Sequence, residues 1–70
     1  MTKAEFIAQM LAIVERHSLA VAKANDAQQA VYEANRTAGV VGIGCALRLH
    51  ALALRELADA IDAQAHWLAS

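Results

Sequence analysis

The sequence predicts an all-α protein, in which two long antiparallel helices form a helical hairpin that associates into a homodimeric four-helix bundle. Three observations support this prediction. The 70 residues include 18 Ala and eight Leu but only 4% aromatic residues, a composition typical of closely packed helices. The chain has no Pro, and its three Gly lie together within residues 39–44. On either side of these glycines, apolar residues recur at alternating steps of four and three.

The first helix is expected over residues 3–37. Thr2 and Glu5 have the spacing of a capping box, in which the Thr hydroxyl accepts a hydrogen bond from the third helical amide. Gly39 follows a basic last turn, and a Gly there commonly provides the left-handed backbone that ends a helix. One heptad row, in which only the histidine is polar, predicts the packed face: Phe6, Met10, Ile13, His17, Ala20, Ala24, Ala27, Val31 and Ala34.

The turn is expected at residues 38–40 and the second helix at 41–68. An entirely apolar heptad row predicts the face of the second helix that packs on the first: Leu47, Ala51, Leu54, Ala58, Ile61, Ala65 and Leu68. Folding the chain back at Gly39 sets Ala24 opposite Leu54, so that a small residue makes room for a large one.

An alternative arrangement has three helices, with a break near Asn25 and Asp26, where Asp26 would cap a new helix. The heptad row runs through this segment without interruption, which favours two helices. In either case residues 1–70 form a single domain, because a chain this short cannot bury a second core.

Association is expected because a two-helix rod cannot enclose all of its apolar side chains. The segment from Val40 to Leu54 is apolar on nearly every side, which is typical of an enclosed helix. Pairing of two hairpins into a four-helix bundle would enclose it, although the apolar shoulders of the two helices are expected on opposite flanks. The residues predicted to meet a second copy or another partner are Val21, Ile43, Leu49, Leu52, Leu57 and Trp67.

Composition and charge disfavour several classes of protein. A lone Cys45 cannot form an internal disulfide, which disfavours a secreted disulfide scaffold and favours the reducing cytoplasm. The most apolar stretch, residues 38–54, contains Arg48 and His50 and is shorter than a membrane span. A net charge of −1 provides no general attraction to nucleic acid or anionic lipid.

No arrangement of residues predicts a catalytic, cofactor or metal site. His17, His50 and His66 fall at different levels of the hairpin, and a pair such as Asp62 with His66 lacks a third ligand. Cys45 is interpreted as a small buried residue. The glycine run lacks the preceding strand and the following Lys-Ser/Thr of a phosphate loop, and its last member, residue 44, is expected to permit close helix approach. Neither an enzyme activity nor a small-molecule substrate nor a cofactor is expected.

The favoured hypothesis for function is a small, non-enzymatic protein-interaction module of bacterial or phage type, a regulator or inhibitor that binds another protein's surface. It depends on the surplus of apolar surface. A first alternative is a nucleic-acid-binding helical-bundle regulator, whose candidate contacts are Arg16, Lys23, Arg36, Arg48 and Arg55, a strip that acidic residues interrupt. A second alternative is a membrane-associated helical peptide.

Overall fold

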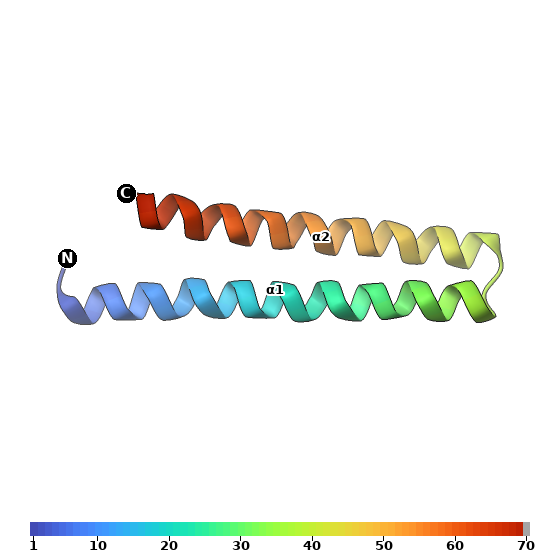
Figure 1. Ribbon diagram of the computed structural model, residues 1–70, viewed down its shortest axis with the longest axis horizontal. Helices are drawn as coiled ribbons and strands as arrows, with labels where there is room; N and C mark the ends of the chain where they lie inside the picture. Colours follow the sequence, from blue (N-terminus) through green and yellow to red (C-terminus); the bar gives the residue numbers. More distant parts are fainter. Residues whose placement is uncertain (70) are drawn as a thin grey trace.

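The computed structural model describes residues 1–69, which form two antiparallel helices (Figure 1). Helix α1 spans Lys3–Thr37 and helix α2 spans Val40–Ala69, against the predicted ranges 3–37 and 41–68. The hairpin measures 54 × 16 × 10 Å, and the start of α1 and the end of α2 lie at the same end of this rod. The prediction of an all-helical hairpin is confirmed. The three-helix alternative is wrong, because α1 continues through Asn25 and Asp26.

The two ends of α1 are closed differently. At the start, the Oγ1 atom of Thr2 accepts a hydrogen bond from the Glu5 amide at 3.1 Å, as the capping-box spacing predicts. At the other end Ala38 is extended, with φ −103° and ψ 157°, and its amide donates to the Ala34 carbonyl at 2.9 Å. The prediction of a left-handed glycine is wrong, since no glycine in residues 1–69 has a positive φ. The extended Ala38 already takes the chain out of the helix, so left-handed backbone is not needed.

The two-residue connection depends on Gly42 rather than on Gly44. A Cβ atom placed on Gly42 would lie 2.7 Å from the Cβ of Ala38, whereas one placed on Gly44 would meet nothing within 4 Å. The prediction of a close approach at Gly44 is therefore wrong. The tight connection brings Ala38 against the first turn of α2, and only a glycine hydrogen fits beneath it.

The zone of contact between the helices, called the seam below, has the predicted face of α1. Ala20, Ala24 and Val31 are buried there. The half-buried members are Ile13, His17, Ala27 and Ala34. This row therefore packs on α2 as its heptad spacing predicts, while the first two members of the predicted row remain more exposed.

The α2 side of the seam differs from the prediction. Its buried or half-buried row is Ile43, Ala46, His50, Ala53, Leu57, Ala60, Gln64 and Trp67. The predicted row faces solvent instead, so Leu54, for example, is 46% exposed and does not pack in the seam opposite Ala24. Two properties favour the observed row: its alanines at every seventh position allow the backbones to approach closely, and it supplies Gln64, whose Oε1 lies 2.8 Å from Nδ1 of His17.

The core of a single hairpin is small. The buried hydrophobic residues are five alanines and one valine, and no large side chain of the described residues is fully buried. The accessible surface is 5246 Å², whereas a globular protein of 7.5 kDa exposes roughly 4,200 Å². The rod thus exposes about 1,000 Å² more than a globular chain of the same mass.

Candidate interaction surfaces

The hairpin has two long flanks, one on each side of the seam, because each helix presents a row of residues on either side of its packed row. An ion pair between Nζ of Lys23 and Oε2 of Glu56, at 2.8 Å, crosses from α1 to α2 on one of them. We call this side the grooved flank, because two open grooves run along it. The opposite side is called the apolar flank.

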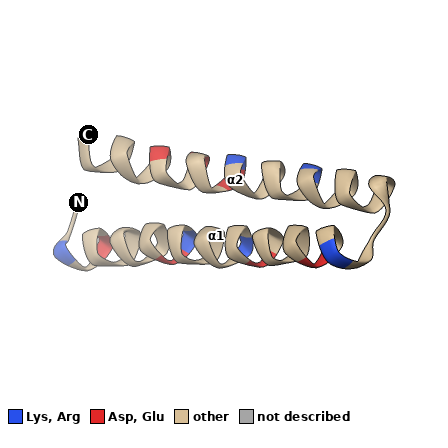
Figure 2. Ribbon diagram, turned by 45° about the vertical axis from the view of Figure 1, so that its right-hand side comes forward, with Lys and Arg blue, Asp and Glu red and all other residues tan. Residues whose placement is uncertain are grey.

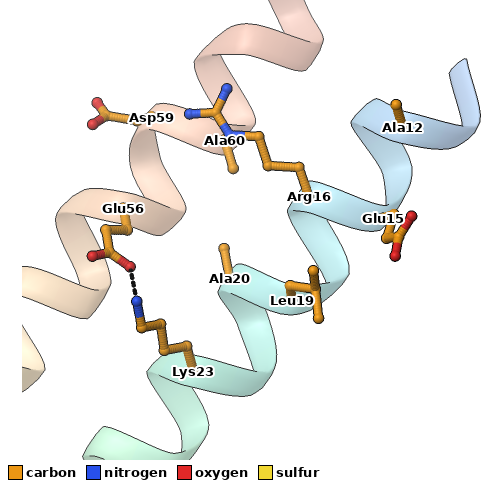
Figure 3. A pocket seen from close by; sticks show the side chains of 9 residues that line it. All are labelled: Ala12, Glu15, Arg16, Leu19, Ala20, Lys23, Glu56, Asp59 and Ala60. Atoms are coloured by element: carbon orange, nitrogen blue, oxygen red, sulfur yellow. Dashed lines mark hydrogen bonds and ion pairs between the residues drawn. The ribbon is translucent and has the colours of Figure 1, made fainter. Parts of the chain in front are cut away.

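The first groove lies around Lys23 and Glu56 and is about 490 Å³ in volume (Figure 3). Its floor includes Ala20 and Ala60, the latter only 1% exposed. Figure 3 shows the side chain of Arg16 extending from α1 toward α2 over this floor. Charged groups of both signs therefore surround a floor of small apolar residues.

The second groove continues along the same flank toward the turn and is about 300 Å³ in volume. Leu49 and Leu52 line it from α2, and they are 62% and 50% exposed. Asp26 and Lys23 line it from α1. Glu56 lines it from α2, so this groove combines two exposed leucines with two carboxylates and an ammonium group.

The apolar flank carries one row of large apolar residues from each helix, at a spacing of seven. The rows are Ile7, Val14 and Val21 on α1, and Leu47, Leu54, Ile61 and Leu68 on α2. Toward the turn, the α1 row continues with the neutral polar residues Gln28 and Asn35. All seven apolar side chains are between 37% and 69% exposed. Helical geometry places both rows on the side of the seam away from the Lys23–Glu56 pair. The prediction of shoulders on opposite flanks is wrong, because α2 turns its Ile43 row toward α1.

Among residues 1–69, no charged residue belongs to the apolar flank. The next row outward on α2 consists of small residues, Gly44, Ala51, Ala58 and Ala65, and the corresponding row on α1 is also uncharged: Ala4, Leu11, Ser18, Asn25 and Tyr32. Lys, Arg, Asp and Glu lie elsewhere, spread along both helices with their signs mixed (Figure 2). The flank is therefore a strip of neutral surface that runs the length of the rod.

The six residues predicted at a partner interface are distributed over different parts of the hairpin. Val21 belongs to the apolar flank, whereas Leu49 and Leu52 line the grooved flank. Ile43 and Leu57 are half-buried in the seam. Their role in binding stays a prediction. The sequence does not identify the α2 row of the apolar flank as a surface, because its apolar heptad spacing predicts that it packs in the seam.

Trp67, the sixth of these residues, closes the open end of the hairpin. Its indole Nε1 donates a hydrogen bond to Oε1 of Gln9 at 3.1 Å. Its ring centroid lies 5.0 Å from that of Phe6. We call these three residues the clasp, since they join the first turns of α1 to the last turns of α2.

The histidines and the cysteine are not brought together. His17 bonds to Gln64, His50 is half-buried in the seam, and His66 is exposed. Within residues 1–69, no three His, Cys, Asp or Glu side chains are grouped so that they could hold a metal ion. Cys45 is exposed, so the prediction of a buried cysteine is wrong; the position of α2 against α1 places residue 45 away from the seam.

The five cations proposed to contact nucleic acid also do not form one patch. Lys23 is paired with Glu56, and Arg36 with Glu33. Arg16 lines the first groove. Arg48 and Arg55 are seven residues apart and share a face of α2 away from the seam.

Neither α1 nor α2, over the residues described, is both long and apolar enough to cross a membrane. Comparisons of the chain with protein-family models, with curated proteins and with solved structures found no match. The function is therefore inferred from the surfaces of the hairpin itself.

Proposed function

We propose that this chain is a small, non-enzymatic protein-interaction module, a regulator or inhibitor that binds another protein's surface, and that its working form is a homodimeric four-helix bundle. One observation carries the proposal: a hairpin that buries six small residues exposes seven large apolar ones at heptad spacing along one flank. Scattered apolar residues on a surface are ordinary, but a continuous apolar strip is typical of an interaction site.

The grooved flank is the surface proposed for the partner protein. Exposed Leu49 and Leu52 provide apolar anchors, and the neighbouring Lys23 and Glu56 provide charges of both signs. An amphipathic helix of another protein, lying along this groove, could bury the leucines and hydrogen-bond to the charged groups. A bundle formed through the apolar flank would leave this surface on the outside.

The proposal includes no chemical reaction and places the protein in the cytoplasm. Both grooves are open, and their charged groups are spread along the rod, whereas catalytic groups require a site that converges on a substrate and excludes water. The exposed thiol of Cys45 is compatible with a reducing compartment.

Affinity capture from a lysate of the source organism tests the proposal. The double variant Leu49→Asp/Leu52→Asp places two charges in the second groove, and Val41→Asp is its control, because Val41 is 81% exposed. The same protein should be captured by the wild type and by the control, and its yield should fall at least about tenfold with the double variant. Capture of no specific protein, or equal capture by all three, would contradict the proposal.

A nucleic-acid-binding regulator is the second candidate, and the shared face of Arg48 and Arg55 favours it. It requires a mobility shift of duplex or hairpin RNA at low salt that weakens as salt rises and disappears in Arg48→Ala/Arg55→Ala. If no shift occurs at low salt, this candidate is eliminated. Co-sedimentation with liposomes tests the membrane-associated alternative in the same preparation.

A further inference from the structure

We infer that the apolar flank is the self-association surface, and that its occupant is the apolar flank of a second copy of this chain, centred on Leu54 and Ile61. This inference rests on the proposed homodimer and deepens it, because it assigns the dimer to one face of the hairpin. It leaves the grooved flank free for another protein.

The amount of exposed surface agrees with a second copy. The hairpin exposes 5246 Å², about 1,000 Å² more than a globular protein of its mass. A stable interface of ordinary size buries about 800 Å² on each partner. Covering one flank of the rod would therefore bring the exposed surface of each chain close to that of a globular protein.

The absence of charge on the flank also favours a copy of the same flank. Burying a charged side chain of a partner against neutral apolar rows would leave that charge uncompensated, which is strongly unfavourable. The α2 row of this flank is flanked outward by small residues and includes no Lys, Arg, Asp or Glu. A second copy brings an equally neutral surface, so the interface buries no unpaired charge.

The shape of the flank is self-complementary as well. On α2 the large side chains of Leu54 and Ile61 project beside the small Ala51, Ala58 and Ala65, at the same spacing of seven. A two-fold axis brings identical patches together, so large residues of each copy can pack over small residues of the other. The large residues extend from Leu47 to Leu68, over about 32 Å of helix, which gives such an interface several repeats of this contact.

The test compares charged substitutions on the two flanks by light scattering coupled to size exclusion, over a range of chain concentrations. The variant Leu54→Glu/Ile61→Glu changes the apolar flank, and Leu49→Glu/Leu52→Glu is the matched control on the grooved flank, since its leucines are at least as exposed. Wild type and control should have twice the 7.5 kDa chain mass. The apolar-flank variant should be monomeric, with a dimer dissociation constant raised at least about 100-fold.

A charge-pairing experiment keeps the inference testable if that variant does not fold alone. Leu54→Lys/Ile61→Lys and Leu54→Glu/Ile61→Glu should each fail to self-associate, whereas an equimolar mixture should form a helical heterodimer, because opposite charges then meet across the axis. The corresponding mixture of charged variants at residues 49 and 52 should show no such preference.

The outcomes separate this inference from the proposed function. A dimer that survives Leu54→Glu/Ile61→Glu but dissociates in Leu49→Glu/Leu52→Glu would overturn the assignment of the face and leave the homodimer intact. A wild type that is monomeric at the highest concentration reached would overturn both the inference and the homodimer. Capture of a partner protein would then decide whether the chain is an interaction module.

Discussion

The two flanks of the hairpin are built from the same two helices, yet they differ in charge and in surface shape. The grooved flank has two open grooves and an ion pair that joins the helices across the seam. The apolar flank has two rows of large side chains and no charge. On the grooved flank, exposed leucines lie beside charges that are hydrated or paired, whereas covering the apolar rows lowers the free energy of the chain without burying a charge. A helical hairpin of 70 residues can therefore have one face suited to its own assembly and another suited to a different partner.

Removing the same atoms from each flank should have the largest effect and tests whether only the apolar flank is covered. Fully burying a leucine is worth about 1.5–3 kcal/mol. Since Leu54 is 46% exposed in the hairpin and occurs twice in a dimer, Leu54→Ala should weaken the dimer by about 1.5–3 kcal/mol. Leu49→Ala on the grooved flank should change it by less than about 0.5 kcal/mol. Sedimentation equilibrium measures the dimer dissociation constant of both variants. Equal effects would mean that the second copy does not cover one flank in preference to the other.

A second substitution acts on the seam that both flanks share. Ala60 is 1% exposed, so Ala60→Leu should force the helices apart and lower the free energy of unfolding by about 1–3 kcal/mol. Ala22→Leu, on an exposed position of α1, should change it by less than about 0.5 kcal/mol. Urea denaturation at one fixed chain concentration provides the comparison. If both leucines are tolerated equally, residue 60 does not lie in the seam.

Two glycines extend the comparison of the flanks to the turn. Gly42 lies in the row of Leu49 on the grooved flank, where a Cβ would approach Ala38 to 2.7 Å; Gly44 lies in the row of Ala51 on the apolar flank, where a Cβ meets nothing. Gly44→Ala should therefore stabilise α2 by about 0.5–1 kcal/mol, through helix propensity alone. Gly42→Ala should destabilise the hairpin by about 1 kcal/mol, because the steric overlap exceeds that gain. Thermal unfolding followed by circular dichroism should show a higher melting temperature for Gly44→Ala and a lower one for Gly42→Ala. A change in the same direction for both variants would contradict the tight turn.

The smallest effect concerns the ion pair of the grooved flank. The side chains of Lys23 and Glu56 are 65% and 40% exposed, so their coupling in a double-mutant cycle with alanine should be about 0.2–1 kcal/mol. This coupling should decrease as salt is added, whereas the effect of Leu54→Ala should not. A coupling that is insensitive to salt would mean that the pair is shielded from water.

The structure of α1 could be predicted from the sequence, and the orientation of α2 about its own axis could not. Thr2 and Glu5 mark the start of α1 by purely local chemistry. Only the row that contains His17 stays almost entirely apolar along the whole helix, because the row of Ile7, Val14 and Val21 becomes polar at Gln28. Helix α2 has two such rows, and counting apolar residues selects the one that contains Leu54 rather than the one that contains Gln64. The choice depends on close backbone approach and on the His17–Gln64 hydrogen bond, which are properties of two helices together. The signal that could have found it is His17 itself, since a polar residue in a seam requires a polar partner.

The same ambiguity explains which parts of the candidate surfaces were predicted. Leu49 and Leu52 belong to neither heptad row of α2, so they were expected on the outside, and both are exposed. The heptad spacing of Leu54 and Ile61 predicts an interior row, so the sequence does not identify this row as a surface. A helix that is apolar on two faces does not reveal, from its own sequence, which face its nearest neighbour covers.

The clasp at the open end affects how the hairpin unfolds. A hairpin whose helices are connected at one end by two residues is expected to fray from the other end. Each pair of facing turns in the seam is held mainly by its own few contacts. Trp67, whose ring is tilted against that of Phe6 and whose indole donates a hydrogen bond to Gln9, lies where such fraying would begin. Amide hydrogens in the outer turns should therefore exchange with solvent more slowly than they would without the clasp. Opening the last level separates two aromatic rings and breaks the Trp67–Gln9 hydrogen bond, so the clasp opposes fraying at this end.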